Sequence, residues 1–306
     1  MVAAGSLNST LNETANPAAC PEHYETTATQ TIKTLVYCVI ILFSLVGNSI
    51  VIFTVWRNNS MRSVTNLFIG NLAASDLLIT FLGMPNMITQ LYLGQKWIFG
   101  DAICKIVVFF QSISDFLRSF LGRFMLGVTW GTSLAVMAPF LYAQRVVVGP
   151  QGYERCIEDW APAFNPQTAA KDYTLVLFVT LYVFPLLTML FMYSFIVSKL
   201  WKRQIPGFRS SRDEIRTRTL TNKVVKMLIT VITLFCVCWL PLHVYLFMVY
   251  FAYDKITCFD SSMSFYFTSL FLQHANSAIN PYLYALFHQK YREGFKAAWT
   301  CSFIRF

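Results

Sequence analysis

The chain has 306 residues, of which 56% are hydrophobic and 13% are charged, against about 25% charged in ordinary soluble domains. This composition indicates an integral membrane protein. The net charge of +9 would suit a nucleic-acid-binding protein, but the basic residues lie in the gaps between apolar segments, as a membrane topology requires. We therefore expect the lipid bilayer, and no nucleic acid, as a partner.

The first residues form a polar tail. Residues 1–30 lack the apolar core of a cleavable signal peptide, so we expect none. Asn8 and Asn12 each begin a glycosylation sequon, whereas Asn16 precedes a proline and is excluded. Two sequons so close together favour an external N-terminus, and we expect residues 1–32 to form a glycosylated extracellular tail.

Five segments are long and apolar enough to cross a bilayer, which takes about 20 residues of helix. They are Thr34–Trp56, Asn66–Gln90, Tyr173–Leu200, Val224–Phe251 and Ser264–Phe287. Basic residues gather after the first segment, between the third and fourth, and after the fifth. Because basic loops stay in the cytoplasm, all three agree on one topology with the N-terminus outside. We expect a transmembrane bundle over residues 33–287.

A sixth apolar region, Cys104–Ala143, is too long for one span and too short for two spans with a loop. The topology requires an even number of crossings here, and two crossings leave less apolar surface in water than none. The inner turn then falls at Arg118–Arg123. The first arm, Lys105–Leu117, has about 13 residues and rises about 20 Å against a hydrocarbon core of about 30 Å. We therefore expect a shortened third helix.

Polar side chains and prolines lie near the middle of several predicted spans. The polar residues are Asn48, Asp76, Asn276, Ser277 and Asn280. Because such groups are costly in lipid, they either face a wet interior or make hydrogen bonds between helices. The prolines are Pro185, Pro241 and Pro281. Three spans with a midspan proline indicate helices that bend.

The segment after the last span is predicted to be an amphipathic helix. Aromatic residues recur there at i, i+4 spacing, with basic residues on the other side: Phe287, Tyr291, Phe295 and Trp299. We expect residues 288–306 to be cytoplasmic and to lie on the inner leaflet. Cys301 in this tail is either a palmitoylation site or an ordinary free thiol.

None of the eight cysteines forms a CxxC pair, so we expect no zinc site. Cys38, Cys236 and Cys238 lie inside apolar segments, which predicts packing roles. Four others lie at span edges or in polar loops, where an oxidising environment would let them pair: Cys20, Cys104, Cys156 and Cys258.

Six markers occur in order: Gly47-Asn48, NLAASD ending at Asp76, WIFG before Cys104, Pro185 with Tyr193, FCVCWLP over Phe235–Pro241, and NPYLY over Asn280–Tyr284. Together they resemble the rhodopsin-like G protein-coupled receptors, over roughly residues 30–300. The resemblance implies an all-α seven-transmembrane helix bundle in the plasma membrane, with a truncated third helix and a short amphipathic C-terminal helix. It implies no enzymatic activity and no cofactor.

The same resemblance implies a conformational switch in the membrane. Its residues would be Asn48, Asp76, Tyr193, Phe235, Trp239, Pro241, Asn276, Asn280, Pro281 and Tyr284. Asp76 is in addition a candidate site for a sodium ion.

Two segments on the outer side narrow the resemblance to particular neuropeptide receptors. CIEDW, Cys156–Trp160, with the following DYTLVLFVTLYVFPL resembles neuropeptide FF receptors, and WIFGDAICKIVVFFQSIS resembles both these and neuropeptide Y-type receptors. The resemblance implies an Arg-Phe-amide-type peptide ligand. It also implies a disulfide from Cys104 to Cys156 that pins the outer loop over the pocket.

Ligand contacts are implied as well. Gln111 would contact the C-terminal amide of the peptide; its alternative role is an interhelical hydrogen bond. Glu158 and Asp159 would pair with a basic ligand residue, as carboxylates do with guanidinium groups; their alternative is a plain solvated loop. Trp239 and His274 complete the implied set.

Two positions depart from these relatives. Tyr250 stands where they have an acidic residue near the outer end of the sixth span, and Leu270 stands where they have a histidine, with His274 one turn deeper. The ligand can therefore differ from theirs. A second bridge between Cys20 and Cys258 is also conceivable, since both residues are expected outside.

The third span contains no Asp-Arg-Tyr-like motif. The sequence resembles a receptor from which the inner half of the third helix and the second inner loop have been removed, by splicing, by a gene-model error or by evolution. In the family that helix takes part in opening and closing the G-protein cleft, and ligand switching requires such a bistable element. We therefore expect impaired coupling to a heterotrimeric G protein.

Three hypotheses follow. The first is a neuropeptide receptor that signals through a G protein. The second is a non-signalling receptor fragment that associates with a full-length sibling. The third is a small transporter or channel, which would explain the intramembrane polar residues but predicts repeated span pairs that the sequence lacks.

Overall fold

The computed structural model of the chain describes residues 26–58, 61, 64–94, 96–107, 135–149, 152–188, 190–191, 194, 198, 211–252 and 264–300. Several predicted features lie outside these residues: the sequons at Asn8 and Asn12, the turn at Arg118–Arg123, and Gln111, Tyr193, Cys20, Cys258 and Cys301.

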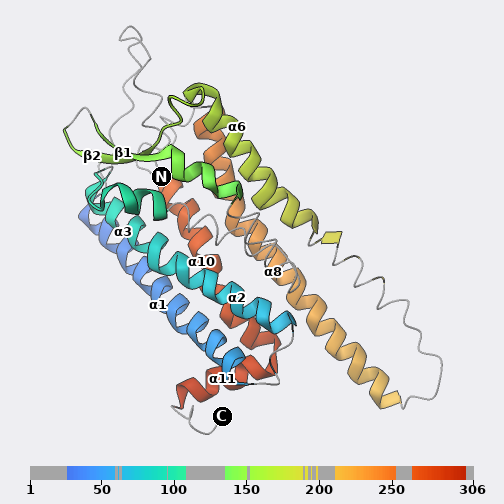
Figure 1. Ribbon diagram of the computed structural model, residues 1–306. Helices are drawn as coiled ribbons and strands as arrows, with labels where there is room; N and C mark the ends of the chain where they lie inside the picture. The colour runs from blue at the N-terminus through green and yellow to red at the C-terminus, as the bar shows by residue number, and fades with distance from the viewer. Residues whose placement is uncertain are drawn as a thin grey trace.

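The described chain forms a bundle of long helices with a two-stranded hairpin at one end (Figure 1). In chain order the elements are α1 (Thr27–Arg57), α2 (Val64–Leu78), the π-helical turn η4 (Ile79–Gly83), α3 (Met84–Leu93), β1 (Gln144–Val148), β2 (Glu154–Glu158), α6 (Pro166–Phe178), the π-helical turn η5 (Val179–Val183), α8 (Ser211–Phe251), α10 (Ser264–Phe287) and α11 (Gln289–Trp299). Residues 100–107 and 135–143 are also helical.

The two sides of α1 show why this bundle suits a membrane. The buried residues form one stripe that packs on α2 and α10: Tyr37, Ser44, Gly47, Asn48, Val51, Thr54 and Val55. The exposed residues are large and apolar, among them Ile32, Leu42 and Val46. Polar groups inside and apolar groups outside are the reverse of a soluble helix and indicate contact with lipid. Cys38 lies on the exposed side, so its predicted packing role is wrong.

Among the described residues, four stretches are long and apolar enough to cross a membrane: Thr27–Arg57, Ile69–Leu93, Thr168–Thr188 and Ile229–Phe251. They correspond to four of the five predicted spans. The fifth, α10, is helical over the predicted residues but is less apolar, because polar residues line its buried face. These are Ser269, Gln273, His274, Asn276, Ser277 and Asn280.

Prolines explain the two π-helical turns. η4 ends just before Pro85, and η5 ends just before Pro185. A proline lacks the N–H that an α-helix needs, and its ring clashes with the preceding turn. A wider turn relieves both problems. By contrast, Pro241 and Pro281 lie inside the continuous helices α8 and α10.

α8 begins at Ser211, well before the predicted start at Val224. The basic segment that was placed in a loop is therefore partly helical. Residues 211–223 contain no glycine or proline and include three arginines, so nothing in them ends a helix. In Figure 1 these first turns extend away from the rest of the bundle.

The hairpin consists of β1 and β2, which pair antiparallel. Gln144 lies opposite Glu158, and Val146 lies opposite Cys156. Because side chains alternate along a strand, these four residues share one face. The connecting turn contains Gly152 at φ 78°, a backbone conformation that glycine adopts without steric cost.

α11 lies at the opposite end of the bundle from the hairpin (Figure 1). Its predicted aromatic stripe is divided between two environments. Tyr291 is 0% exposed and donates a hydrogen bond to Asn66 Oδ1 at 3.2 Å, whereas Trp299 is 92% exposed. Gly294 faces α1, where an added Cβ would collide with the Thr54 hydroxyl. One side of α11 therefore packs on the bundle.

Candidate functional site

The hairpin is fastened to residues 96–107, the outer end of the third helical segment. Cys104 and Cys156 form a disulfide, with their Cα atoms 5.7 Å apart. Beside it, the Trp97 backbone amide donates a hydrogen bond to the Glu154 carbonyl at 2.7 Å. The predicted disulfide is thus confirmed, and a backbone tie accompanies it.

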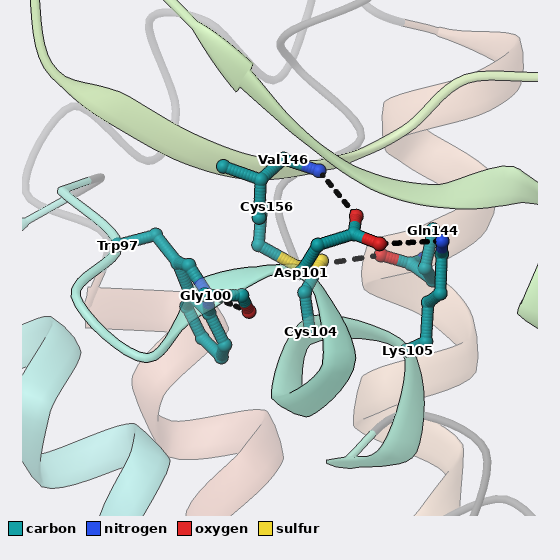
Figure 2. A network of polar contacts seen from close by, with 8 residues as sticks. All are labelled: Trp97, Gly100, Asp101, Cys104, Lys105, Gln144, Val146 and Cys156. Carbon is teal, nitrogen blue, oxygen red and sulfur yellow. Dashed lines mark hydrogen bonds and ion pairs between the residues drawn. A yellow bond between two sulfur atoms is a disulfide. The ribbon is translucent and has the colours of Figure 1, made fainter.

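Asp101 adds a polar tie between the same two elements, as Figure 2 shows. Its Oδ1 accepts a hydrogen bond from the Val146 backbone amide at 3.2 Å, and its Oδ2 pairs with Lys105 one turn further on. The hydrogen bonds from Lys105 and from the Val146 amide lower the pKa of the Asp101 carboxyl. The tie is therefore made by an ionised acceptor at neutral pH.

Glu158 lies at the end of β2, on the same hairpin face as Cys156. Its Oε1 accepts a hydrogen bond from the Trp160 indole at 2.7 Å, and its Oε2 accepts one from the Tyr250 hydroxyl at 2.9 Å. Tyr250 belongs to α8, so this carboxylate joins the hairpin to the outer end of that helix. Burial raises the pKa of the Glu158 carboxyl, against the opposing effect of the two hydrogen bonds.

Asp159, the next residue, is bound differently. Its Oδ1 accepts a hydrogen bond from the Ala161 amide at 3.0 Å, which forms a local turn, and its Oδ2 lies 3.5 Å from Arg145 Nη1. Its own amide donates to the Ala143 carbonyl at 2.8 Å. The two predicted acidic contacts are therefore adjacent in sequence but not equivalent.

Trp239 and Phe235 lie in an aromatic cluster between α8 and η5. Their ring centroids are 5.7 Å apart, and the Phe235 ring stacks on Tyr182 at 5.8 Å. His243 completes the cluster, 4.9 Å from the Tyr182 ring. The Trp239 indole N–H and His243 Nε2 are buried and have no hydrogen-bond partner in the part of the chain that the structure describes. The polar groups of a ligand would therefore find two nitrogens here that are able to form hydrogen bonds.

His274 lies on the buried side of α10 and is 1% exposed. Its Nδ1 is hydrogen-bonded to the Tyr37 hydroxyl of α1 at 3.1 Å. The Tyr37 ring also packs edge-on against Phe267. His274 therefore helps to join α1 to α10, and its contact with a ligand stays a prediction.

Asp76 is part of a buried polar network near the middle of the spans. Asn280 Nδ2 donates a hydrogen bond to Asp76 Oδ2 at 3.0 Å, and the Thr80 hydroxyl donates to the Asp76 carbonyl at 2.7 Å. Asn48 Nδ2 donates to the Ser277 carbonyl at 3.2 Å, which ties α1 to α10. A buried carboxylate is a type of ligand that hard cations prefer. The sodium ion at Asp76 stays a prediction.

Three more of the predicted switch residues lie along the inner half of α10: Asn276, Pro281 and Tyr284. Asn276 and Pro281 are buried, and Gly47 allows close approach, since a Cβ there would lie 2.9 Å from Pro281 Cβ. Tyr284 is buried and packs against Tyr291 of α11, with ring centroids 5.9 Å apart. The structure thus brings the NPYLY segment into contact with α1 and α11.

Three residues of the site were not predicted as contacts. Tyr250 was noted only as a departure from the relatives, Trp160 only as the end of the CIEDW motif, and Asp101 only as part of the segment that follows WIFG. Tyr37 was detectable, since a spacing of eleven residues, about three helical turns, places it on the face of α1 that carries Asn48.

The family described as "7 transmembrane receptor (rhodopsin family)" matches the chain in two segments, residues 47–122 and 117–284. The chain is 30% identical to a QRFP-like peptide receptor of Branchiostoma floridae, over 90% of this chain and 79% of that one. It is 31% identical to a pyroglutamylated RF-amide peptide receptor of Mus musculus, over 87% of this chain and 69% of that one. It is 30% identical to neuropeptide Y receptor type 2 of Mus musculus, over 89% and 77%.

These matches cover both the spans and the outer hairpin, and they agree with the apolar outside and polar inside of the bundle. The chain therefore belongs to the rhodopsin family of seven-transmembrane receptors, within its neuropeptide receptors, which are non-enzymatic multi-pass proteins of the plasma membrane.

Proposed function

We propose that the chain is a receptor for a peptide that ends in an Arg-Phe-amide-like sequence and binds at the outer face of the bundle. The observation that supports this best is the hairpin, which a disulfide holds at the outer end of the bundle and which carries Glu158 and Asp159 beside α8. Carboxylates of this kind recognise guanidinium groups. One of the relatives is by name a pyroglutamylated RF-amide peptide receptor, and another is a QRFP-like peptide receptor.

The deeper part of the ligand would reach the aromatic cluster around Trp239. Trp239 Nε1 and His243 Nε2 have no hydrogen-bond partner among the described residues, and they offer one hydrogen-bond donor and one further polar atom in an apolar setting. Gln111 and His274 are proposed as further contacts. Movement of α8 would then be coupled to the inner switch residues, with sodium at Asp76 favouring one of the two states.

We also propose that the chain lacks the inner half of the third helix and the second inner loop. The absence of an Asp-Arg-Tyr motif supports this, and so does the family match, whose two segments meet at residues 117–122. Coupling to a G protein would then be weak, because one wall of the inner cleft is missing. A non-signalling chain that associates with a full-length receptor is the second candidate function.

The test separates binding from signalling. The chain is expressed with an external epitope tag, and saturable binding of a fluorescent Arg-Phe-amide peptide is measured together with peptide-stimulated nucleotide exchange on a purified G protein. We expect binding with little exchange. Full exchange would contradict the loss of coupling, and no saturable binding would contradict the receptor proposal.

A matched control tests the missing segment directly. The inner third helix and second inner loop of the mouse RF-amide relative are inserted between Arg118 and Arg123. If their absence limits signalling, the extended chain gains nucleotide exchange while its peptide affinity changes little. If exchange stays low, the defect lies elsewhere in the chain.

A further inference from the structure

A short turn at the outer end of the bundle, Trp97–Gly100, has a fixed shape. The Trp97 side chain is buried, and its indole N–H donates a hydrogen bond to the Gly100 carbonyl at 2.8 Å. Gly100 has φ 74°, a conformation that glycine adopts without steric cost. Figure 2 shows both residues beside the disulfide between Cys104 and Cys156. The turn is therefore closed by its own tryptophan, which lies on the protein side.

The two residues at the tip of this turn are apolar and exposed. Ile98 is 55% exposed and Phe99 is 40% exposed. The tip of a loop in water commonly carries Gly, Asn, Asp or Ser, which suit both the turn and the solvent. Neighbouring apolar side chains that stay uncovered indicate contact with a surface other than water.

The turn begins close to the end of a membrane span. The stretch Ile69–Leu93 is long and apolar enough to cross a bilayer, and its last two residues, Tyr92 and Leu93, are exposed. Lys96, directly before the turn, is exposed as well. An aromatic residue and a lysine at the end of a span are typical of the boundary between lipid and water. The apolar tip is therefore continuous with the surface that faces lipid.

The helical segment after the turn continues the same apolar surface. Ile103 and Ile106 are exposed and, three residues apart, lie on one side of this segment. Asp101, Cys104 and Lys105 lie on the opposite side, where Asp101 and Cys104 bind the hairpin. The segment thus has one side for the hairpin and one apolar side that extends the tip of the turn.

We propose that Ile98 and Phe99 insert into the outer leaflet of the bilayer, and that the turn Trp97–Gly100 thereby anchors the hairpin at the membrane surface. The link to the hairpin is direct, because the Trp97 backbone amide donates a hydrogen bond to the Glu154 carbonyl at 2.7 Å. The partner in this contact is lipid, so the inference does not depend on which ligand the chain binds.

The chemistry of the turn allows shallow insertion. Moving the two apolar side chains out of water is favourable, whereas unpaired backbone groups cannot enter the hydrocarbon. Two polar groups of the turn are already satisfied within the protein, since the Trp97 amide bonds to Glu154 and the Gly100 carbonyl accepts from the indole. The backbone can therefore stay at the level of the head groups while the side chains reach the acyl chains, as interfacial segments do.

The first experiment places a nitroxide label at Ile98→Cys in the full chain, reconstituted in phosphatidylcholine vesicles. Leu42→Cys, on the exposed side of α1, is the lipid reference, and Val148→Cys, exposed on the hairpin, is the water reference. The unaltered chain, treated in the same way, gives the signal of native thiols such as the exposed Cys38. The readout is the ratio of the label's collision rate with oxygen, which concentrates in lipid, to that with a water-soluble nickel chelate.

The ratio at Ile98→Cys should be several-fold higher than at Val148→Cys and should approach the value at Leu42→Cys. Phe99→Cys provides a second position with the same expected result, should the first variant fail to fold. A ratio equal to that at Val148→Cys would place the turn in water. A label that collides with neither probe would show that a protein surface, from a ligand or a second copy of the chain, covers the turn. Either result would overturn the proposal.

The second experiment tests the anchoring of the hairpin. In the same vesicles, the double variant Ile98→Asn with Phe99→Asn should exchange the Trp97 amide hydrogen several-fold faster, because the turn loses its hold on the membrane. Val148→Asn is the matched control, since it makes another exposed apolar residue polar outside the turn, and it should leave this exchange unchanged. Equal exchange in the double variant and the unaltered chain would show that lipid contact does not hold the hairpin.

Discussion

The two ends of the bundle are held together by different kinds of interaction. At the outer end, a disulfide, a backbone hydrogen bond and Asp101 fasten the hairpin to residues 96–107. At the inner end, α11 is held by close packing, with Gly294 against Thr54 and Tyr291 fully buried. The outer end is fastened by a covalent bond and by polar ties, whereas the inner end is held mainly by close packing, with the buried hydrogen bond from Tyr291 to Asn66.

The difference follows from the surroundings of each end. The outer loop lies in water, where polar ties are weakened by competition, so a covalent bond contributes most there. The helices lie in lipid, where close approach of small residues gives van der Waals contact that lipid cannot replace as well. The end that recognises a ligand can thus be held in one place without making the spans rigid.

The largest effect should follow from breaking the disulfide. Cys104→Ser removes a link between residues 52 apart in sequence and should lower the free energy of unfolding by about 2–5 kcal/mol, with loss of peptide binding. Thermal unfolding in detergent measures the loss of stability. Cys38→Ser is the control, because this cysteine is free and exposed. Unchanged binding by Cys104→Ser would mean that the polar ties alone hold the hairpin.

At the inner end, stability should instead depend on the size of the side chains that pack between α11 and α1. Gly294→Ala brings a methyl group against Thr54 and should destabilise the chain by about 1–3 kcal/mol. Combining it with Thr54→Ala, which removes the colliding hydroxyl, should restore part of the loss. The melting temperatures of both variants measure this loss of stability and its partial restoration. If Gly294→Ala melts like the unaltered chain, α11 does not pack this closely on α1.

Acidity should affect the outer end through Glu158. Because burial raises the pKa of Glu158, its neutral form persists to higher pH than in an ordinary glutamate. The folded chain thus gains stability from the neutral form at low pH and loses it as pH rises through the raised pKa. Binding of a cationic peptide changes in the opposite direction, since it needs the ionised form, and should weaken as pH falls through that pKa.

Peptide affinity against pH, measured for the unaltered chain and for Glu158→Gln, tests this. The titratable groups that face Glu158 from the neighbouring helices are Tyr250 from α8 and Tyr173 from α6, and a tyrosine hydroxyl does not ionise near neutral pH. On the hairpin itself, Arg145 and Asp159 neutralise each other. The Glu158→Gln profile should therefore be flat over this range. A slope that survives in it would assign the effect to another group.

The smallest effect is expected at Asp101, whose pair with Lys105 is well exposed. Asp101→Asn keeps an acceptor for the Val146 amide and should change peptide affinity less than about twofold. Asp101→Ala removes the acceptor and should speed hydrogen exchange at that amide. Equal exchange in both variants would show that the bond to Val146 contributes nothing to the order of the hairpin.

Much of the fold was predictable because apolar length and the placement of basic residues are local properties of the sequence. The start of α8 was not, since a polar segment without glycine or proline forms either a helix or a loop depending on what surrounds it. The aromatic stripe of α11 was predicted as one membrane face, but Tyr291 turns inward because Asn66 offers its side chain a hydrogen bond across 225 positions.

The sequence by itself determined that this is a membrane receptor of the rhodopsin family with a peptide-receptor-like outer loop, because spans, topology and motifs are written in composition and spacing. Only the tertiary structure decided which partners hold each of the two acidic residues of the hairpin. Arg145 neutralises Asp159, while Tyr250, 92 positions from Glu158, presents that carboxylate without neutralising it. Such partners meet only when the hairpin and α8 pack together, so no local pattern could distinguish two neighbouring carboxylates.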